Sequence, residues 1–170
     1  MSEASPTGRQ LLERAAAELL DPQGRALAAA VQWWPLPGLP ERWPVAVLGS
    51  AGDRVSPALT PQPTPEAVLL LHGFDSSCLE FRRLAPLLVP QATVLVPDLY
   101  GFGFSPRPLQ GEITPEGVLH HLERLVEVAC ERLGVSRLGV IGASMGGSVA
   151  VELARRCPER ISRLLLLAPA

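Results

Sequence analysis

A serine flanked by glycines, in the stretch GASMGG at residues 142–147, could act as a nucleophile. The stretch follows an apolar run and precedes a segment with helical periodicity, which places Ser144 at a turn from a strand into a helix. In such a tight turn Gly142 and Gly146 leave room where a side chain would collide with backbone. The start of the helix would also favour negative charge developing beside the serine. The alternative interpretation is an ordinary glycine-rich helix start, in which Ser144 is only the N-cap.

A second stretch, HGFDSS at residues 72–77, also follows an apolar run and supplies backbone N–H groups. Acyl transfer to a serine needs hydrogen-bond donors aimed at an oxyanion, and these often come from two backbone segments. The N–H groups of Phe74 and Met145 are the two candidates. For His72, which precedes Gly73, we expect a structural side chain that holds this loop.

A third stretch, DLYGFGFSPRP at residues 98–108, begins with Asp98 at the end of a predicted strand. Gly101 and Gly103 could open a dinucleotide-binding loop, but position 106 is Pro where the pattern GxGxxG requires Gly. No helix follows at once, and the P-loop pattern GxxxxGK[ST] occurs nowhere in the sequence. A nucleotide-binding oxidoreductase is therefore disfavoured.

The elements that would position these residues alternate through the second half of the chain. Apolar runs predict buried strands at 67–73, 92–98, 137–142 and 161–169. Helical periodicity predicts helices at 78–89, 115–133 and 144–157, the first begun by a capping box of Ser77 and Glu80 and the second capped by Thr114. Near-continuous apolar strands separated by amphipathic helices predict an α/β fold, with a mostly parallel sheet covered by helices on both faces.

Residues 1–44 are predicted to form an N-terminal extension with helices and a segment rich in Pro and Trp, ahead of a domain at 45–170. The expected elements are a helix at 10–20 begun by a capping box of Thr7 and Gln10, a helix at 24–31, a short edge strand at 45–49, and a turn or linker at 60–66. For the three tryptophans we favour packing in the core or in a lid over stacking on a ligand; these are Trp33, Trp34 and Trp43.

Composition excludes several function classes. The formal net charge of −2 gives no field that would attract nucleic acid or an anionic membrane. Three widely spaced cysteines, an odd number without a CxxC pattern, argue against a disulfide framework or a zinc site. We expect no metal and no cofactor. The N-terminus does not resemble a signal peptide, and no apolar run reaches the ~20 residues of a membrane span, so we expect a cytoplasmic protein.

Four stretches in this order and spacing resemble the α/β-hydrolase superfamily: VLLLHGFDSS, VPDLYGFGFSPRP, VIGASMGGSVAVELA and PERISRLLLLAPA. The likeness is to serine-nucleophile members of the cyanobacterial and plastid kind, and it covers residues 45 to 170. It implies Ser144 as the nucleophile and the N–H groups of Phe74 and Met145 as the oxyanion hole. It gives Asp98 an architectural role. Relatives that open epoxides or remove halides use Asp as the nucleophile, so Ser144 argues against those reactions.

The resemblance also implies a catalytic acid and a catalytic histidine, which the sequence does not supply. In the family the catalytic acid and histidine follow the nucleophile, beyond about the sixth strand. Here His72, His120 and His121 all precede Ser144, and the last two are expected on the surface of a helix. We therefore expect the sequence to be the C-terminally incomplete, N-terminal half of a hydrolase domain, inactive or nearly so by itself. Its last apolar strand would lie near an exposed sheet edge, through which the chain could associate.

The sequence thus predicts a serine hydrolase that acts on a carboxylic ester, thioester or amide through an acyl-enzyme. Its partner would be a small-molecule substrate with a carbonyl centre. The alternative is a non-catalytic protein of the same fold that binds a ligand or a partner, which the missing acid and histidine favour.

Overall fold

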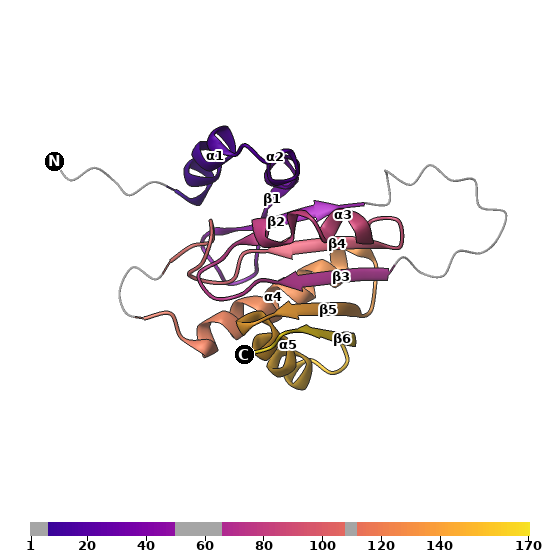
Figure 1. The fold of residues 1–170 in the computed structure, drawn as a ribbon. Coiled ribbons are helices and arrows are strands. Elements are labelled where there is room, and N and C mark those ends of the chain that lie inside the picture. The colour runs from indigo at the N-terminus through magenta and orange to yellow at the C-terminus, as the bar shows by residue number, and fades with distance from the viewer. Residues whose placement is uncertain (1–6, 50–65, 108–111) are drawn as a thin grey trace.

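The computed structural model describes residues 7–49, 66–107 and 112–170, and its centre is a sheet of six strands (Figure 1). The strand order is β1-β2-β4-β3-β5-β6. The strands are β1 (Val31–Pro35), β2 (Arg42–Leu48), β3 (Glu66–Leu71), β4 (Ala92–Pro97), β5 (Leu138–Ala143) and β6 (Ile161–Leu167). Neighbours among β4, β3, β5 and β6 run parallel, whereas β2 is antiparallel to both β1 and β4. The prediction of a mostly parallel α/β sheet is confirmed.

Helices cover both faces of the sheet. They are α1 (Gly8–Glu18), α2 (Pro22–Ala29), the 3₁₀ helix η1 (Cys78–Arg82), α3 (Ala85–Leu88), α4 (Pro115–Leu133) and α5 (Met145–Arg156). One core cluster joins α4 and α5 to the strands, and a second joins α2, η1 and α3 to the other face. In Figure 1 α1 and α2 lie beside β1 and β2, away from β6.

The side-chain caps that the sequence predicts at the beginnings of α1 and α4 are present. The Thr7 hydroxyl accepts the N–H of Gln10 and the Gln10 side chain accepts the N–H of Thr7, which completes the predicted capping box. Helix α4 begins where the Thr114 hydroxyl accepts the N–H of Gly117 and ends at Gly134, whose φ of 64° is left-handed. These two helices were therefore predictable from a few residues at their ends.

The helix expected at 78–89 is wrong, because the structure divides this segment into η1 and α3. Pro86 lies in the first turn of α3, where its missing N–H costs nothing. Its ring would clash with the carbonyl of residue 82 in a continuous helix, so the helix breaks before it. The capping box of Ser77 and Glu80 is also wrong. The Ser77 hydroxyl accepts the N–H of Leu79, whereas the Glu80 carboxylate accepts the N–H of Gly73.

The N-terminal region contributes two strands to the sheet. The strand expected at the edge, 45–49, overlaps β2, which ends at Leu48 and lies between β1 and β4. The edge is β1, VQWWP, which the sequence analysis missed because this short run ends at a proline in a Pro-rich segment. A boundary at residue 44 therefore falls inside β2. The turn expected at 60–66 lies outside the described residues, except for residue 66 at the start of β3.

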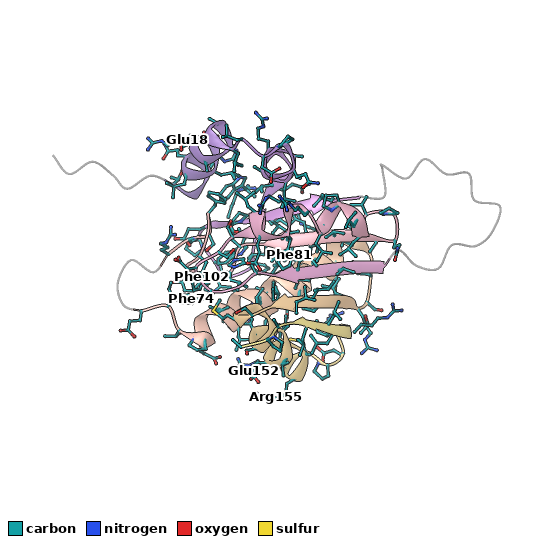
Figure 2. The ribbon with its side chains drawn as sticks, in the orientation of Figure 1. Glu18, Phe74, Phe81, Phe102, Glu152 and Arg155 are labelled. Atoms are coloured by element: carbon teal, nitrogen blue, oxygen red, sulfur yellow. The ribbon has the colours of Figure 1, made fainter. Side chains whose placement is uncertain are left out.

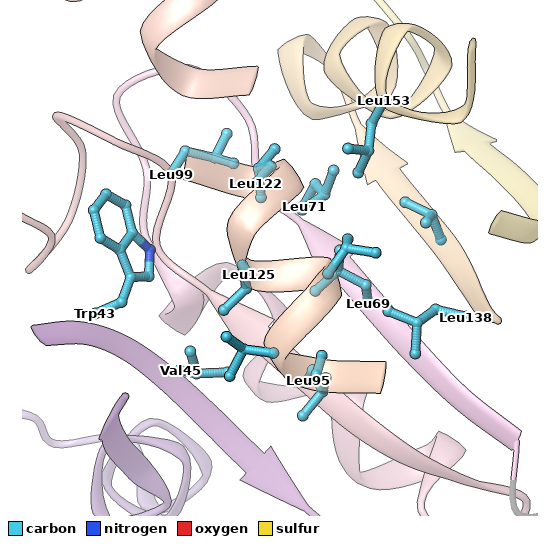
Figure 3. Close-up of a cluster of buried hydrophobic side chains, with 14 of the residues drawn as sticks. Trp43, Val45, Leu69, Leu71, Leu95, Leu99, Leu122, Leu125, Leu138 and Leu153 are labelled. Atoms are coloured by element: carbon cyan, nitrogen blue, oxygen red, sulfur yellow. The ribbon is translucent and has the colours of Figure 1, made fainter. Parts of the chain in front are cut away.

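The larger core cluster lies between the sheet and α4 (Figure 3). Leu122 and Leu125 of α4 face Leu69 and Leu71 of β3, and all four are at most 2% exposed. Trp34 and Trp43 belong to this cluster, so they pack in the core as predicted, whereas Trp33 is half-buried beneath Arg9. Burial of each such side chain contributes roughly 1.5–3 kcal/mol, which fixes α4 on the sheet.

Strand β6 ends the sheet on the other side, and little covers it. Its four consecutive leucines are between 37% and 53% exposed; they are Leu164, Leu165, Leu166 and Leu167. An apolar edge strand is a template for pairing with another chain. Association through this edge stays a prediction.

Replacing Leu125 by Ala removes a side chain that is 0% exposed, and should lower the free energy of unfolding by about 2–5 kcal/mol. Leu87→Ala is the matched control, because Leu87 is 71% exposed and its loss should change stability by no more than about 0.5 kcal/mol. Urea unfolding followed by circular dichroism measures both. Equal effects would contradict the placement of α4 against the sheet.

Candidate active site

Three loops meet at the carboxyl ends of the parallel strands. They follow β3 at His72, β4 at Asp98 and β5 at Ser144, so the three motifs of the sequence lie at one edge of the sheet. The loops after β3 and β5 are in close contact, since a Cβ built on Gly73 would lie 3.5 Å from the Cβ of Ser144.

Ser144 adopts a backbone conformation that is rare for a residue with a side chain. Its φ of 48° and ψ of −121° lie outside the regions that most residues favour. It is exposed, it occupies the N-cap position of α5, and its side chain makes no capping hydrogen bond. The backbone is held on both sides: the Ser144 N–H donates to the Leu167 carbonyl at 3.0 Å, and the Ser144 carbonyl accepts the N–H of Gly147 at 2.8 Å. The turn therefore presents the hydroxyl to solvent.

The two glycines around Ser144 stand where no side chain fits. A Cβ on Gly142 would lie 2.3 Å from the carbonyl oxygen of Gly146. A Cβ on Gly146 would lie 2.2 Å from the carbonyl oxygen of Leu71 and 2.6 Å from that of His72. Helix α5 thus approaches the end of β3 so closely that only glycine is accommodated.

His72 is fully buried and both of its ring nitrogens are engaged. Nε2 accepts the N–H of Leu99 at 3.0 Å, so the ring proton resides on Nδ1 and is donated to the Gly73 carbonyl at 2.8 Å. In a trans peptide the N–H points opposite to the C=O, so this bond also sets the direction of the Phe74 N–H. The two hydrogen bonds of the His72 ring tie the loop after β3 to the loop after β4.

The N–H groups of Phe74 and Met145 are available as donors. Met145 is the first residue of α5, where backbone N–H groups have no acceptor inside the helix. Within the described part of the chain, neither N–H has a hydrogen-bond acceptor. Two unpaired N–H groups, on loops that touch at Gly73 and Ser144, could stabilise an oxyanion formed at Ser144.

Asp98 lies at 0% exposure, and its carboxylate joins two segments. One oxygen accepts the N–H of Cys78 at 2.5 Å and the other accepts the N–H of Phe104 at 2.7 Å. Burial raises the pKa of Asp98, while these two N–H donors oppose the rise. The Asp98 carbonyl in turn accepts the indole N–H of Trp43 at 2.8 Å. Asp98 therefore fixes the loop after β4 against η1 and β2.

A cavity of about 650 Å³ opens between the loops and the two helices α4 and α5. Phe74 and Met145, the residues of the two free N–H groups, both line it. Phe102 lies against Phe74, with ring centroids 5.5 Å apart (Figure 2). The other apolar lining residues are Ile113, Val118, Leu119 and Val149, and charged or polar ones include Asp75, Arg107, Ser148 and Glu152. The cavity can hold the apolar part of a small molecule.

The other two histidines lie on α4. His120 is exposed as predicted, but the same prediction is wrong for His121, which is half-buried. The His121 ring stacks on Tyr100 at 4.1 Å and on Trp43 at 4.8 Å, and burial lowers its pKa. Helical periodicity could not reveal this, because the two aromatic partners come from distant segments. Neither His120 nor His121 has a hydrogen bond to Ser144.

Other site types find no support in the described residues. Across 7–49, 66–107 and 112–170, no group of three His, Cys, Asp or Glu side chains could hold a metal ion. The three cysteines are free thiols. None of the helices in the described part of the chain is long and apolar enough to cross a membrane.

Gly146→Ala places a methyl group against two backbone carbonyls that cannot retreat easily, so it should cost about 3 kcal/mol or more. Gly139→Ala in neighbouring β5 is the control, because its nearest contact would be an ordinary 3.7 Å to Val68. Thermal and urea unfolding of both variants tests the close approach of α5 to β3. A Gly146 variant as stable as the control would contradict it.

Asp98→Asn keeps the shape of the side chain but replaces one accepting oxygen by an NH₂ group. Either the N–H of Cys78 or that of Phe104 then loses its partner in a buried site, at about 1–3 kcal/mol. Asp75→Asn, at an exposed position, should leave stability unchanged. Urea unfolding distinguishes the two, and a fully stable Asp98 variant would refute the assigned role.

Comparison with known proteins agrees with this geometry. The family model described as "alpha/beta hydrolase fold" matches residues 66–170. A soluble epoxide hydrolase of Corynebacterium sp. (strain C12) is 37% identical over 100 residues, which are 59% of this chain and 33% of that protein. The alpha/beta hydrolase domain-containing protein VTE7 of Arabidopsis thaliana is 34% identical over 149 residues, which are 86% of this chain and 42% of that protein.

A solved structure of lip1 from Acinetobacter baumannii shares the fold, with a TM-score of 0.69 at 23% identity, over 99% of this chain and 48% of that one. The chain therefore spans less than half the length of each of these three proteins. Since the family model matches well over half of its residues, the chain belongs to the α/β-hydrolase superfamily.

Proposed function

We propose that this chain carries the nucleophile and oxyanion hole of a serine hydrolase that acts on carboxylic esters, thioesters or amides. One observation carries the proposal: exposed Ser144 stands in a strained turn at the start of α5, beside a loop with a free Phe74 N–H. Strained backbone that the surrounding structure holds in place is typical of active sites.

In the proposed reaction the Ser144 Oγ attacks the substrate carbonyl carbon and loses its proton to a base. The carbonyl oxygen becomes an oxyanion, which the N–H groups of Phe74 and Met145 stabilise. The C–O, C–S or C–N bond then breaks, and the leaving group departs with a proton and leaves an acyl-enzyme. Attack by water on that ester releases the acid and restores the serine.

The cavity beside Phe74 and Met145 supports a small-molecule substrate with an apolar group next to its carbonyl. Position 144 is Ser, whereas family members that open epoxides use Asp, so we favour acyl transfer although one relative is named an epoxide hydrolase. The three free thiols support a reducing compartment such as the cytoplasm.

None of the three histidines of the sequence hydrogen-bonds the Ser144 hydroxyl. A serine without its base is a weak nucleophile, so we expect the 170-residue chain to react slowly. The same observation favours a second candidate function, a non-catalytic protein that binds a carbonyl compound in the cavity. Binding of an ester analogue without turnover would distinguish it.

A fluorophosphonate probe tests the proposed nucleophile directly. We expect slow labelling of the folded chain, acceleration by added imidazole, which supplies the absent base, and complete loss of labelling in Ser144→Ala. Intact-mass spectrometry and peptide mapping locate the adduct. Labelling at another residue, or none at Ser144 even with imidazole, would overturn the proposal.

A further inference from the structure

Glu80 makes a contact with the loop after β3 that its own helix does not require. Its Oε2 accepts the N–H of Gly73 at 2.9 Å, across seven residues of sequence. The N-terminus of η1 is already capped by Ser77, whose hydroxyl accepts the N–H of Leu79. Glu80 is itself exposed, so burial does not dictate where its carboxylate lies.

This contact completes the restraint of Gly73. The Gly73 carbonyl accepts the Nδ1–H of His72 at 2.8 Å, and the Gly73 N–H donates to Glu80. Both peptide groups that flank Gly73 are therefore held by a side chain, and the second of them contains the Phe74 N–H. Glycine has the widest conformational freedom of any residue, so a Gly73 held only through its carbonyl could still rotate at its N–H side and tilt the peptide that contains the Phe74 N–H.

The restraint acts at the nucleophile. A Cβ built on Gly73 would lie 3.5 Å from the Ser144 Cβ and 3.6 Å from Glu80 Oε2. The Asp75 backbone that follows is left-handed, with a φ of 51°, and the Phe74 side chain is exposed. A small rotation at Gly73 would thus change the direction of the Phe74 N–H relative to Ser144.

We propose that Glu80 is a positioning residue for the oxyanion hole: its hydrogen bond to the Gly73 N–H holds the Phe74 N–H in the direction that an oxyanion at Ser144 needs. This assignment rests on the proposed function, because the direction of the Phe74 N–H matters only if an oxyanion forms at Ser144. Glu80 touches neither the substrate nor the reacting atoms.

Three variants separate this role from a general effect on the fold. Glu80→Ala removes the acceptor, whereas Glu80→Gln keeps a neutral oxygen that can still accept the Gly73 N–H. Glu18→Ala is the control, because Glu18 is an exposed glutamate on α1, far from Phe74 in Figure 2. Urea unfolding should give the parental stability for Glu80→Gln and Glu18→Ala, and at most a modest loss for Glu80→Ala, in which the Gly73 N–H loses its acceptor while the fold is kept.

The first measurement is the amide spectrum of the ¹⁵N-labelled chain, which needs no activity. We expect Glu80→Ala to shift the amide resonances of Gly73 and Phe74 and to speed their hydrogen exchange. Glu80→Gln should shift them less, and Glu18→Ala should leave both unchanged. A shift confined to Gly73, with the Phe74 amide as in the parent chain, would overturn the assignment.

The second measurement is the reaction of Ser144 with a fluorophosphonate in the presence of imidazole. Glu80→Ala should lower the maximal labelling rate by roughly 10- to 100-fold with little change in half-saturating probe concentration, since misplaced groups cost rate rather than binding. Glu80→Gln should recover most of that rate. If Glu80→Ala reacts with the probe at the parental rate, the positioning role of Glu80 is wrong, whereas the proposed function still stands. If the parent chain does not react with the probe, the proposed function is wrong. The effect of Glu80→Ala on the Phe74 amide resonance then tests alone whether Glu80 positions this N–H.

Discussion

The arrangement of the site depends on one buried carboxylate, that of Asp98. A charge at 0% exposure is costly unless hydrogen bonds compensate for the water it loses, and here two backbone N–H groups do so. These groups belong to Cys78, at the start of η1, and Phe104, in the loop after β4. A Cβ on Gly103 would lie 2.5 Å from the carboxyl carbon, so the loop closes tightly around it. One side chain thus fixes two of the three loops that border Ser144.

The residue after Asp98 extends this order to the beginning of the loop after β3. The Leu99 N–H donates to His72 Nε2, which leaves the ring proton on Nδ1, and Nδ1 donates to the Gly73 carbonyl. Hydrogen bonds therefore lead without a gap from the end of β4 to the peptide that contains the Phe74 N–H. Because every member is buried or backbone, water cannot readily replace these bonds, and they restrain the peptide of the Phe74 N–H from the side of the Gly73 carbonyl.

The sequence predicts well those structural features that depend on a few adjacent residues. The bounds of α4 follow from Thr114, Pro115 and Gly134, and the tight turn at Ser144 follows from its flanking glycines. What it predicts poorly depends on distant partners. Strand β1 is defined by pairing with β2, His121 is half-buried only because Tyr100 and Trp43 reach it, and the partner of Glu80 is a loop glycine. Local pattern gave the Glu80 carboxylate the wrong donor, because helix capping was the only contact of Glu80 that the sequence indicated.

The oxyanion hole and the general base of a serine hydrolase site are made of different kinds of group. The turn and the oxyanion donors are backbone, and residues between β3 and the start of α5 hold them through short-range packing and hydrogen bonds. The base is a side chain that need not come from the same segment, and none of the histidines here is placed to act on Ser144. Under the proposed function, stabilisation of an oxyanion and activation of the nucleophile are therefore separable in this chain. We then expect a molecule that mimics the tetrahedral intermediate to engage the N–H groups of Phe74 and Met145 even where proton transfer from Ser144 is slow, because these N–H groups need no base to donate.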